Sequence, residues 1–240
     1  MKQRLIALYA QELFRPGLLG FFINPFFIIR RGLFRGIRHH APALKGRMLD
    51  FGCGEKPYRD LFQVDEYIGV DLAVSGHGTE GSEVDVYYDG RHIPFPDAHF
   101  DAVLASEVFE HVFNLDEIMA ELHRVMKPGA RMLITAPFGW DEHEKPYDFA
   151  RYTCFAWDAI LQRHGFRVIE AGKNGHYVST VTQLWIAYLF QHILPKRPFL
   201  RILLNPLLIT PWTLLGLMTG AVLPKNRDYY LNNVLLVERV

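Results

Sequence analysis

The sequence has little cysteine, no net charge and no repeated or low-complexity segment. Its two cysteines, Cys53 and Cys154, are too few for a disulfide scaffold and fit a reducing compartment. Its 26 basic and 26 acidic residues cancel, which argues against a nucleic-acid partner held by bulk charge. With 50% hydrophobic and 22% charged residues, the chain is neither a disordered segment, a collagen-like fibre nor a bare coiled coil. Its 240 residues fit one α/β domain with a sizeable addition.

The opening residues do not predict a secretory signal peptide. Gln11, Glu12 and Arg15 interrupt the apolar run, and no small-residue cleavage site follows it. We therefore expect a cytoplasmic protein.

The zero net charge hides a segregation along the chain. Residues 1–47 hold nine basic residues and one acidic residue, residues 48–180 hold 11 and 23, and residues 181–240 hold six and two. Either the basic ends pair with the acidic centre, or they form a part of the protein that meets another partner.

Short apolar runs in the central part alternate with helical patterns, as in a doubly wound α/β sheet. Seven runs are predicted as strands: 47–52, 67–71, 84–88, 100–105, 131–136, 166–171 and 231–237. A helix is predicted after Asn114, with Glu117 completing a capping box and residues 127–129 ending it. A second helix is predicted over 153–164.

The turn after the first strand predicts a nucleoside cofactor. Gly52 and Gly54 allow a tight turn whose backbone N–H groups approach a ligand, and Asp71 ends the next strand 19 residues after Gly52, where an acid can bind ribose hydroxyls. A dinucleotide fits less well, because a third glycine is missing and Asp50 and Glu55 place negative charge near its phosphates. S-adenosylmethionine, with an ammonium and a sulfonium group, fits this charge better.

Six segments in this order resemble class I S-adenosylmethionine-dependent methyltransferases of the broad type 11-like group. They are LDFGCG (49–54), IGVD (68–71), DGRHIPFPD (89–97), FDAV (100–103), EHV (110–112) and RVMKPGA (124–130). The resemblance implies a Rossmann-like, seven-stranded, mostly parallel sheet with an antiparallel last strand.

The resemblance also implies roles for individual residues in holding S-adenosylmethionine. Gly52 and Gly54 would line its methionine part with Asp50 near the ammonium, and Asp71 would hold the ribose. The other expected contacts are Asp89 on the adenine amino group, Gly90 beneath the ring, Ile93 and Phe95 on either side of the base, and Ser106 and Glu107 at the amino-acid end. An ordinary turn is the alternative interpretation of Asp89 and Gly90.

The loop over 140–152 is too polar and aromatic to be a minimal connection. We expect His143 to be a general base, oriented by Glu142 or Asp141, with His111 as the second candidate. The alternative is that His143 is a solvated loop residue and Arg151–Asp148 a structural pair. No metal is expected, because the spacing of His111, Asp141, His143 and Glu144 matches no metal template.

Two runs near the C-terminus, 177–195 and 202–224, contain no Asp, Glu, Lys or Arg and approach the length that spans a bilayer. Pro206, Pro211 and Gly216 interrupt the second run, and a hairpin would place the bases of 196–201 on the far side, against the positive-inside bias. We therefore expect the insert to lie on a membrane surface, to act as a lid or to form a homodimer interface.

These observations predict four parts: a basic apolar N-terminal segment (1–46), a methyltransferase core (47–176), an apolar helical insert (177–225) and the last strand (226–240). The expected activity is methyl transfer from S-adenosylmethionine to a small-molecule, glycan or lipid-linked acceptor, peripheral to the cytoplasmic membrane face if the insert binds lipid. The alternatives are a nicotinamide-dependent oxidoreductase or epimerase and a non-catalytic membrane-associated scaffold.

Overall fold

The computed structural model describes residues 2–72 and 83–240, with side chains from residue 8 onward. The chain divides into two compact units. The sheet unit comprises Gly36–Phe138, Glu142–Gly172 and Asn233–Val240, and the helical unit comprises Met1–Arg35, Gly139–Asp141 and Lys173–Asn232. The predicted boundaries of the four functional parts stay predictions.

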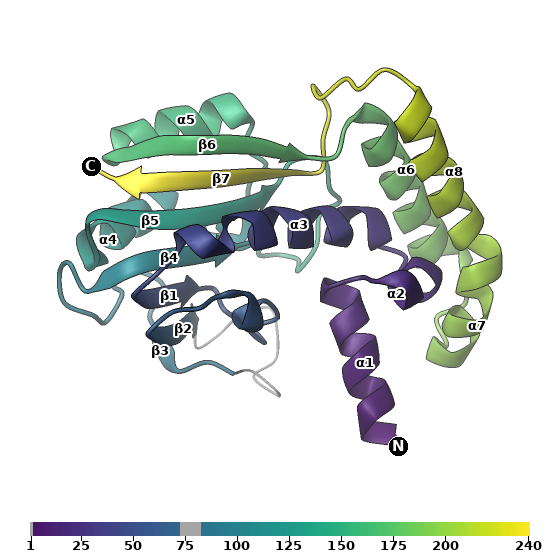
Figure 1. Cartoon of the computed structure of the whole chain (residues 1–240), viewed down its shortest axis with the longest axis horizontal. Helices are drawn as coiled ribbons and strands as arrows, with labels where there is room; N and C mark the ends of the chain where they lie inside the picture. The colour runs from purple at the N-terminus through teal and green to yellow at the C-terminus, as the bar shows by residue number, and fades with distance from the viewer. Residues whose placement is uncertain (1, 73–82) are drawn as a thin grey trace. The chain divides into compact units, whose positions relative to one another are not determined.

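A seven-stranded sheet has the order β3-β2-β1-β4-β5-β7-β6 (Figure 1). Its strands are β1 (Arg47–Phe51), β2 (Glu66–Leu72), β3 (Val86–Tyr88), β4 (Phe100–Ser106), β5 (Met126–Pro137), β6 (Phe166–Asn174) and β7 (Asn232–Arg239). The first five pair in parallel, and β7 runs opposite to its neighbours β5 and β6. The predicted doubly wound, mostly parallel sheet with an antiparallel last strand is confirmed.

Two helices of the sheet unit pack on the sheet through apolar faces. They are α4 (Leu115–Val125) and α5 (Cys154–Arg163). Ile118 and Leu122 of α4 are fully buried, and Trp157 of α5 joins the same core. Thr153 caps α5, because its hydroxyl accepts a hydrogen bond from the backbone N–H of Ala156. Three single turns complete the unit: η1 (Ala41–Ala43), η2 (Arg59–Leu61) and η3 (Phe109–His111).

Two predicted details around α4 are wrong. The side chain of Asn114 caps no helical N–H group; its amide instead donates hydrogen bonds to the Glu117 carboxylate and to the carbonyl of Gly90. The strand after α4 begins at Met126 rather than at residue 131, since Met126 already pairs with Phe100 of β4. An irregularity between Phe100 and Ala102 lets the pairing resume at Arg131, so residues 127–129 lie inside the strand.

The helical unit contains α1 (Lys2–Phe14), α2 (Leu18–Ile23), most of α3 (Phe27–His40), α6 (Tyr177–Tyr188), the π-helical turn Leu189–Ile193, α7 (Pro198–Leu208) and α8 (Thr210–Val222). The insert is therefore helical, as predicted. Helices α6 and α8 lie side by side (Figure 1). Gly216 permits this approach, because a Cβ atom there would lie 2.3 Å from Thr182 Cγ2.

Candidate active site

The turn after β1 brings together the predicted glycines and the acid at the end of β2. Gly52 has a φ of 69°, and a Cβ atom on it would lie 2.2 Å from Val108 Cγ2, so only glycine fits. The backbone N–H of Gly54 donates to Asp71 Oδ2 at 3.0 Å. Because β1 and β2 are parallel neighbours, their carboxyl ends place Asp71 beside this turn.

Asp50 lies at the base of the same turn and is almost completely buried. The hydroxyl of Tyr67 donates to Asp50 Oδ2 at 2.6 Å. Burial raises the pKa of Asp50 to about 7, although the hydrogen bond from Tyr67 and the charge of Lys56 act in the opposite direction. The carboxyl group therefore gains its charge near neutral pH, or when a cation approaches it.

Lys56 is a buried residue of this turn that the sequence analysis did not single out. Its ammonium lies 2.6 Å from Asp85 Oδ2, and the same carboxylate oxygen accepts the N–H of Gly69 at 2.6 Å. The pair ties the turn after β1 to the segment that leads into β3. The one sequence signal that could have pointed to Lys56 is the absence of a third glycine in this loop.

The expected adenine contacts are only partly in place for that role. Asp89 is exposed, and its Oδ1 accepts the N–H groups of Arg91 and His92, which is the turn arrangement considered as the alternative. Gly90 has a φ of 84° beside Leu72. The expectation that Ile93 covers a base is wrong, because this side chain is fully buried in the core. Phe95 is partly buried and stacks on His99.

Ser106 and Glu107 lie where β4 ends, at the same edge of the sheet. The Ser106 hydroxyl is 3.0 Å from the hydroxyl of Thr135 on the neighbouring strand β5. Glu107 has a φ of 54°, and its N–H donates to the Thr135 carbonyl at 2.9 Å. These contacts fix the loop that continues from β4 into η3.

A buried carboxyl group and two histidines meet beyond this loop. Glu110 of η3 is 2% exposed. His111 Nε2 lies 3.8 Å and His143 Nε2 lies 3.9 Å from the same oxygen, Glu110 Oε1. The two imidazole rings lie edge to face with their centres 4.9 Å apart. Glu144 Oε1 lies 3.6 Å from His111 Nε2. The structure thus brings His111 and His143 together around a carboxyl group that the sequence analysis had treated only as part of a motif.

The acid beside His143 is Asp148, and this corrects the expectation that Glu142 orients the ring. His143 Nδ1 lies 3.2 Å from Asp148 Oδ2, whereas Glu142 is exposed and pairs with Lys145. The guanidinium of Arg151 donates to both oxygens of Asp148, at 2.5 and 2.6 Å. Partial burial raises the pKa of Asp148, but the hydrogen bonds from Arg151 and from the His143 backbone N–H prevail and lower it to about 2. The structural Arg151–Asp148 pair is therefore also what holds His143.

Burial and the nearby Glu107 raise the pKa of Glu110 well above its ordinary value. Histidine lone pairs, a buried acid and a fixed Asp148 carboxylate are groups that can move a proton or hold a cation. They lie at the carboxyl ends of β4 and β5, next to the end of β1 in the sheet order. Ligands of open α/β sheets bind at this edge.

The chain is similar in part to known methyltransferases. Residues 49–134 match the family model described as a methyltransferase domain. Over 70 residues the chain is 36% identical to the ubiquinone/menaquinone biosynthesis C-methyltransferase UbiE of Ralstonia pickettii, and to that of Ralstonia nicotianae. This match covers 29% of this chain and 29% of each relative, so the chain is similar to less than a third of their length.

Solved structures extend the likeness of the fold to nearly the whole chain. A SAM-dependent methyltransferase from Archaeoglobus fulgidus superposes with a TM-score of 0.56 at 17% identity, covering 97% of this chain and 99% of that one. Phosphoethanolamine N-methyltransferase 2 of Haemonchus contortus, solved with S-adenosyl-L-methionine, gives 0.56 at 17% identity, covering 98% and 57%. The chain therefore has the fold of these solved methyltransferases, and its residues 49–134 match a methyltransferase domain.

Proposed function

We propose that the protein transfers a methyl group from S-adenosylmethionine to an acceptor. The observation that carries this proposal is the turn after β1, where Gly52, Gly54 and Asp71 meet within a methyltransferase family match. The methionine part would lie along the glycines, with its ammonium near Asp50 and its ribose on Asp71. Ser106 at the end of β4 would lie at the amino-acid end, and Asp89 and Gly90 would flank the adenine.

The histidine cluster supplies a group that can activate the acceptor. With its Nδ1 proton directed to the Asp148 carboxylate, His143 keeps the Nε2 lone pair for a proton. For an acceptor hydroxyl, the S–CH₃ bond breaks while the O–CH₃ bond forms, the hydroxyl proton passes to His143 Nε2, and neutral S-adenosylhomocysteine leaves. Holding the hydroxyl in line with the S–CH₃ bond accounts for much of the rate in such a displacement.

The proposal is tested by donor binding and by turnover with labelled S-adenosylmethionine against extracted metabolites, glycans and lipids. Asp71→Ala should weaken donor binding, whereas His143→Ala should bind the donor normally and lose turnover. Wild-type protein that binds no donor would overturn the proposed activity. Turnover that survives in His143→Ala would remove the proposed base and leave the donor site standing.

The helical unit supports a proposal for the acceptor class, because it exposes large apolar side chains and buries small or polar ones. Helix α8 buries small and polar residues, among them Thr213, Gly216 and Gly220, while Leu214, Met218 and other large apolar side chains are exposed. Helices that face lipid pack against protein through small residues in this manner. Within the stretch Pro198–Val222, an 18-residue window has a mean hydropathy of 1.5 and only 28% of that window is buried, so by length and composition the stretch could also cross a membrane.

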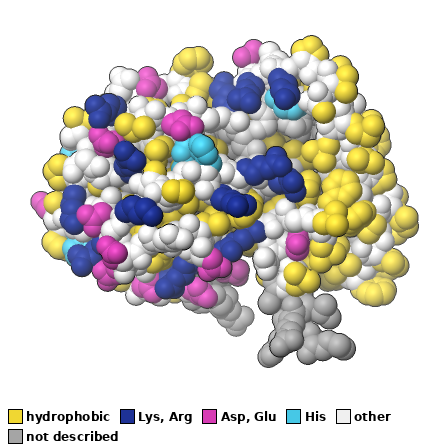
Figure 2. Space-filling model, in the orientation of Figure 1, with side chains coloured by type: hydrophobic (Ala, Val, Ile, Leu, Met, Phe, Trp, Pro, Cys, Tyr) yellow, Lys and Arg dark blue, Asp and Glu magenta, His cyan; other side chains and the backbone are white. Residues whose placement is uncertain are grey.

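The charge of the helical unit indicates which surface covers these side chains. The unit contains twelve basic and three acidic residues, a net charge of +9, whereas the sheet unit contains fourteen and twenty-three, a net charge of −9. Figure 2 shows hydrophobic side chains gathered over α6–α8. An apolar surface on a basic unit is complementary to a bilayer with anionic headgroups. We propose that the protein is peripheral to the cytoplasmic membrane face and that its acceptor is lipid-linked.

Vesicle flotation tests the membrane proposal. The full chain should float with vesicles of mixed zwitterionic and anionic phospholipid and less with purely zwitterionic ones. Replacing Leu214 and Met218 by serine should weaken flotation. Phe155→Ser is the matched control, because Phe155 is an equally apolar side chain, 82% exposed, on α5 of the sheet unit. If the protein forms a stable dimer and does not bind anionic vesicles, the apolar surface contacts a second copy of the chain instead.

A further inference from the structure

Glu110 is a buried acid without the hydrogen bonds that such a group normally has. Its side chain is 1% exposed, and neither carboxyl oxygen accepts a hydrogen bond from the residues that the structure describes. Within the same described part of the chain, His111 Nε2 is also buried without a hydrogen-bond partner. Burying a polar group without a partner is unfavourable by roughly 1–3 kcal/mol in proteins. Two such atoms facing each other indicate that something else occupies the space between them.

In both histidines Nδ1 carries the ring proton and lies close to an acceptor oxygen, which leaves a lone pair on the Nε2 atom that faces Glu110. His111 Nδ1 lies 2.7 Å from the Tyr147 carbonyl, which can only accept, so the proton is on Nδ1. His143 Nδ1 lies 3.2 Å from the ionised Asp148; the longer contact, 3.4 Å to Arg151 Nη2, would need the other tautomer. Histidines whose second nitrogen donates to a carbonyl or carboxylate are the arrangement found around bound metal ions.

We propose that Glu110, His111 and His143 bind a divalent first-row transition-metal ion, with Glu144 as a fourth ligand. One ligand atom from each of the first three residues lies within 4.8 Å of the other two. Four ligands at about 2.1 Å from an ion in tetrahedral geometry lie about 3.4 Å apart. The separations of 3.8 Å and 3.9 Å from Glu110 Oε1 to His111 Nε2 and His143 Nε2 therefore need only small side-chain movements. Glu144 Oε1 lies 3.6 Å from His111 Nε2 but outside the group of mutually close atoms, so its side chain has to move further.

The donor set selects the kind of ion. Two imidazole nitrogens with two carboxylates suit Zn²⁺, Co²⁺, Mn²⁺ or Fe²⁺, whereas Mg²⁺ and Ca²⁺ prefer oxygen ligands alone. Two carboxylates also neutralise a divalent charge. The spacing along the sequence matches no template because the ligands come from two separate loops, one after β4 and one after β5.

An ion here would deepen the proposed reaction, and this step rests on the proposed methyl transfer. The ion would bind an acceptor oxygen and lower its pKa, so that His143 acts as a ligand and the proposed base operates only in the metal-free protein. Metal binding itself does not depend on methyl transfer.

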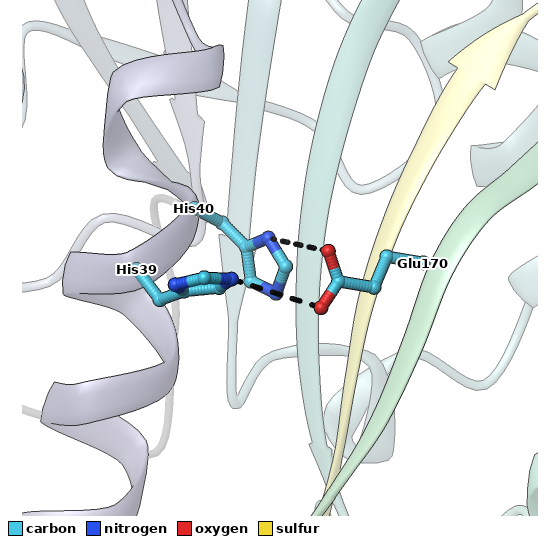
Figure 3. Close-up of side chains that lie close together, drawn as sticks. All are labelled: His39, His40 and Glu170. Carbon is cyan, nitrogen blue, oxygen red and sulfur yellow. Dashed lines mark ion pairs between the residues drawn. The ribbon is translucent and has the colours of Figure 1, made fainter.

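A second group of metal-type side chains provides an internal control (Figure 3). His39 and His40, at the end of α3, face Glu170 of β6 across 3.7 and 3.9 Å. The side chains of His39 and Glu170 are 70% and 53% exposed, so water can satisfy them. Nothing in this group is both buried and without a hydrogen bond among the described residues, so it carries no proposal.

The test titrates tag-free, chelator-treated protein with Co²⁺, follows the visible absorption of the ion, and then displaces it with Zn²⁺. Wild type and His39→Ala should each bind one tight equivalent. Glu110→Gln, which conserves shape, and His143→Ala should bind at least tenfold more weakly. Asp148→Asn should weaken binding 10–100-fold by releasing the His143 ring. Unfolding curves of each variant show whether it is folded.

Three results would overturn the metal site: no tight equivalent in the wild type, loss of binding in His39→Ala, or wild-type affinity in folded Glu110→Gln. S-adenosylmethionine binding by Glu110→Gln separates the two proposals. If Glu110→Gln binds S-adenosylmethionine as tightly as the wild type does, and neither the wild type nor any variant binds Co²⁺, only the metal site fails. If Co²⁺ binds as expected and no protein binds the donor, only the proposed methyl transfer fails.

Discussion

The affinity for S-adenosylmethionine should depend on pH through Asp50. This carboxyl group is buried at the turn after β1, and its pKa is raised to about 7. Its anion is the proposed partner of the donor's ammonium, so the donor binds best to the ionised form. Protonation of Asp50 competes with donor binding, and the apparent affinity falls as the pH is lowered through 7.

The size of the effect follows from the pKa. With a pKa of about 7, the apparent dissociation constant should rise about tenfold at pH 6 and about 100-fold at pH 5, relative to pH 8. Above about pH 8 the donor's own α-amino group loses its proton, so the informative range is pH 5–7.5. S-adenosylhomocysteine carries the same ammonium without the sulfonium and should show the same slope.

Isothermal titration calorimetry across this range measures the dependence. Asp50→Asn removes the titrating group and should flatten the slope while weakening binding at pH 8. Tyr67→Phe removes the hydrogen bond that favours the ionised form, so the whole curve should move to higher pH by about one unit. An unchanged slope in Asp50→Asn would show that Asp50 does not meet the ammonium.

Three further outcomes are expected. Gly52→Ala should lower the unfolding free energy by about 2–4 kcal/mol in urea titrations, and more than Gly54→Ala, because only the Cβ at 52 would meet Val108. Asp71→Asn should weaken donor binding about 10–100-fold by calorimetry while the fold persists. Folded Asp50 keeps its proton up to about pH 7 and the unfolded chain releases it near pH 4, so wild-type stability relative to Asp50→Asn should fall, by up to about 4 kcal/mol, as the pH rises between these values.

The sheet could be predicted because strands buried on both faces read as apolar runs, and the meeting of the glycine turn with Asp71 because parallel strands bring Gly52 and Asp71 to one edge. The start of β5 could not be predicted in this way. Lys127, Pro128 and Gly129 predict the end of a helix, and α4 does end just before them, at Val125. What they do not predict is that the strand begins at once, through the long-range pairing of Met126 with Phe100.

Only the histidines of the acid–histidine cluster could be predicted from the sequence, because their acid partners depend on long-range folding. His143 and His111 stand out as residue types, but which acid contacts each ring depends on how the loop after β5 folds. Glu142 is the sequence neighbour of His143, yet Asp148, five residues on, accepts the His143 N–H and lies beside its ring. The burial of Glu110 leaves no trace in its own motif, because burial is a property of the surrounding core.

The segregation of charge could be read from the sequence, and the structure adds which side chains the charged residues of each unit contact. The sheet unit pairs its acids with its own bases, as in Arg47–Glu66, Lys127–Asp101 and Arg124–Asp97. In the helical unit Arg201 lies over the ring of Phe190 at 4.4 Å, and Lys173 over that of Tyr230 at 4.5 Å. A cation that lies on an aromatic face can meet an anionic headgroup in the proposed membrane contact while its stem stays in contact with hydrocarbon. Hydropathy alone could not distinguish a membrane surface from a buried lid, since both require apolar helices. The exposure of Leu214 and Met218 supports the proposed membrane contact.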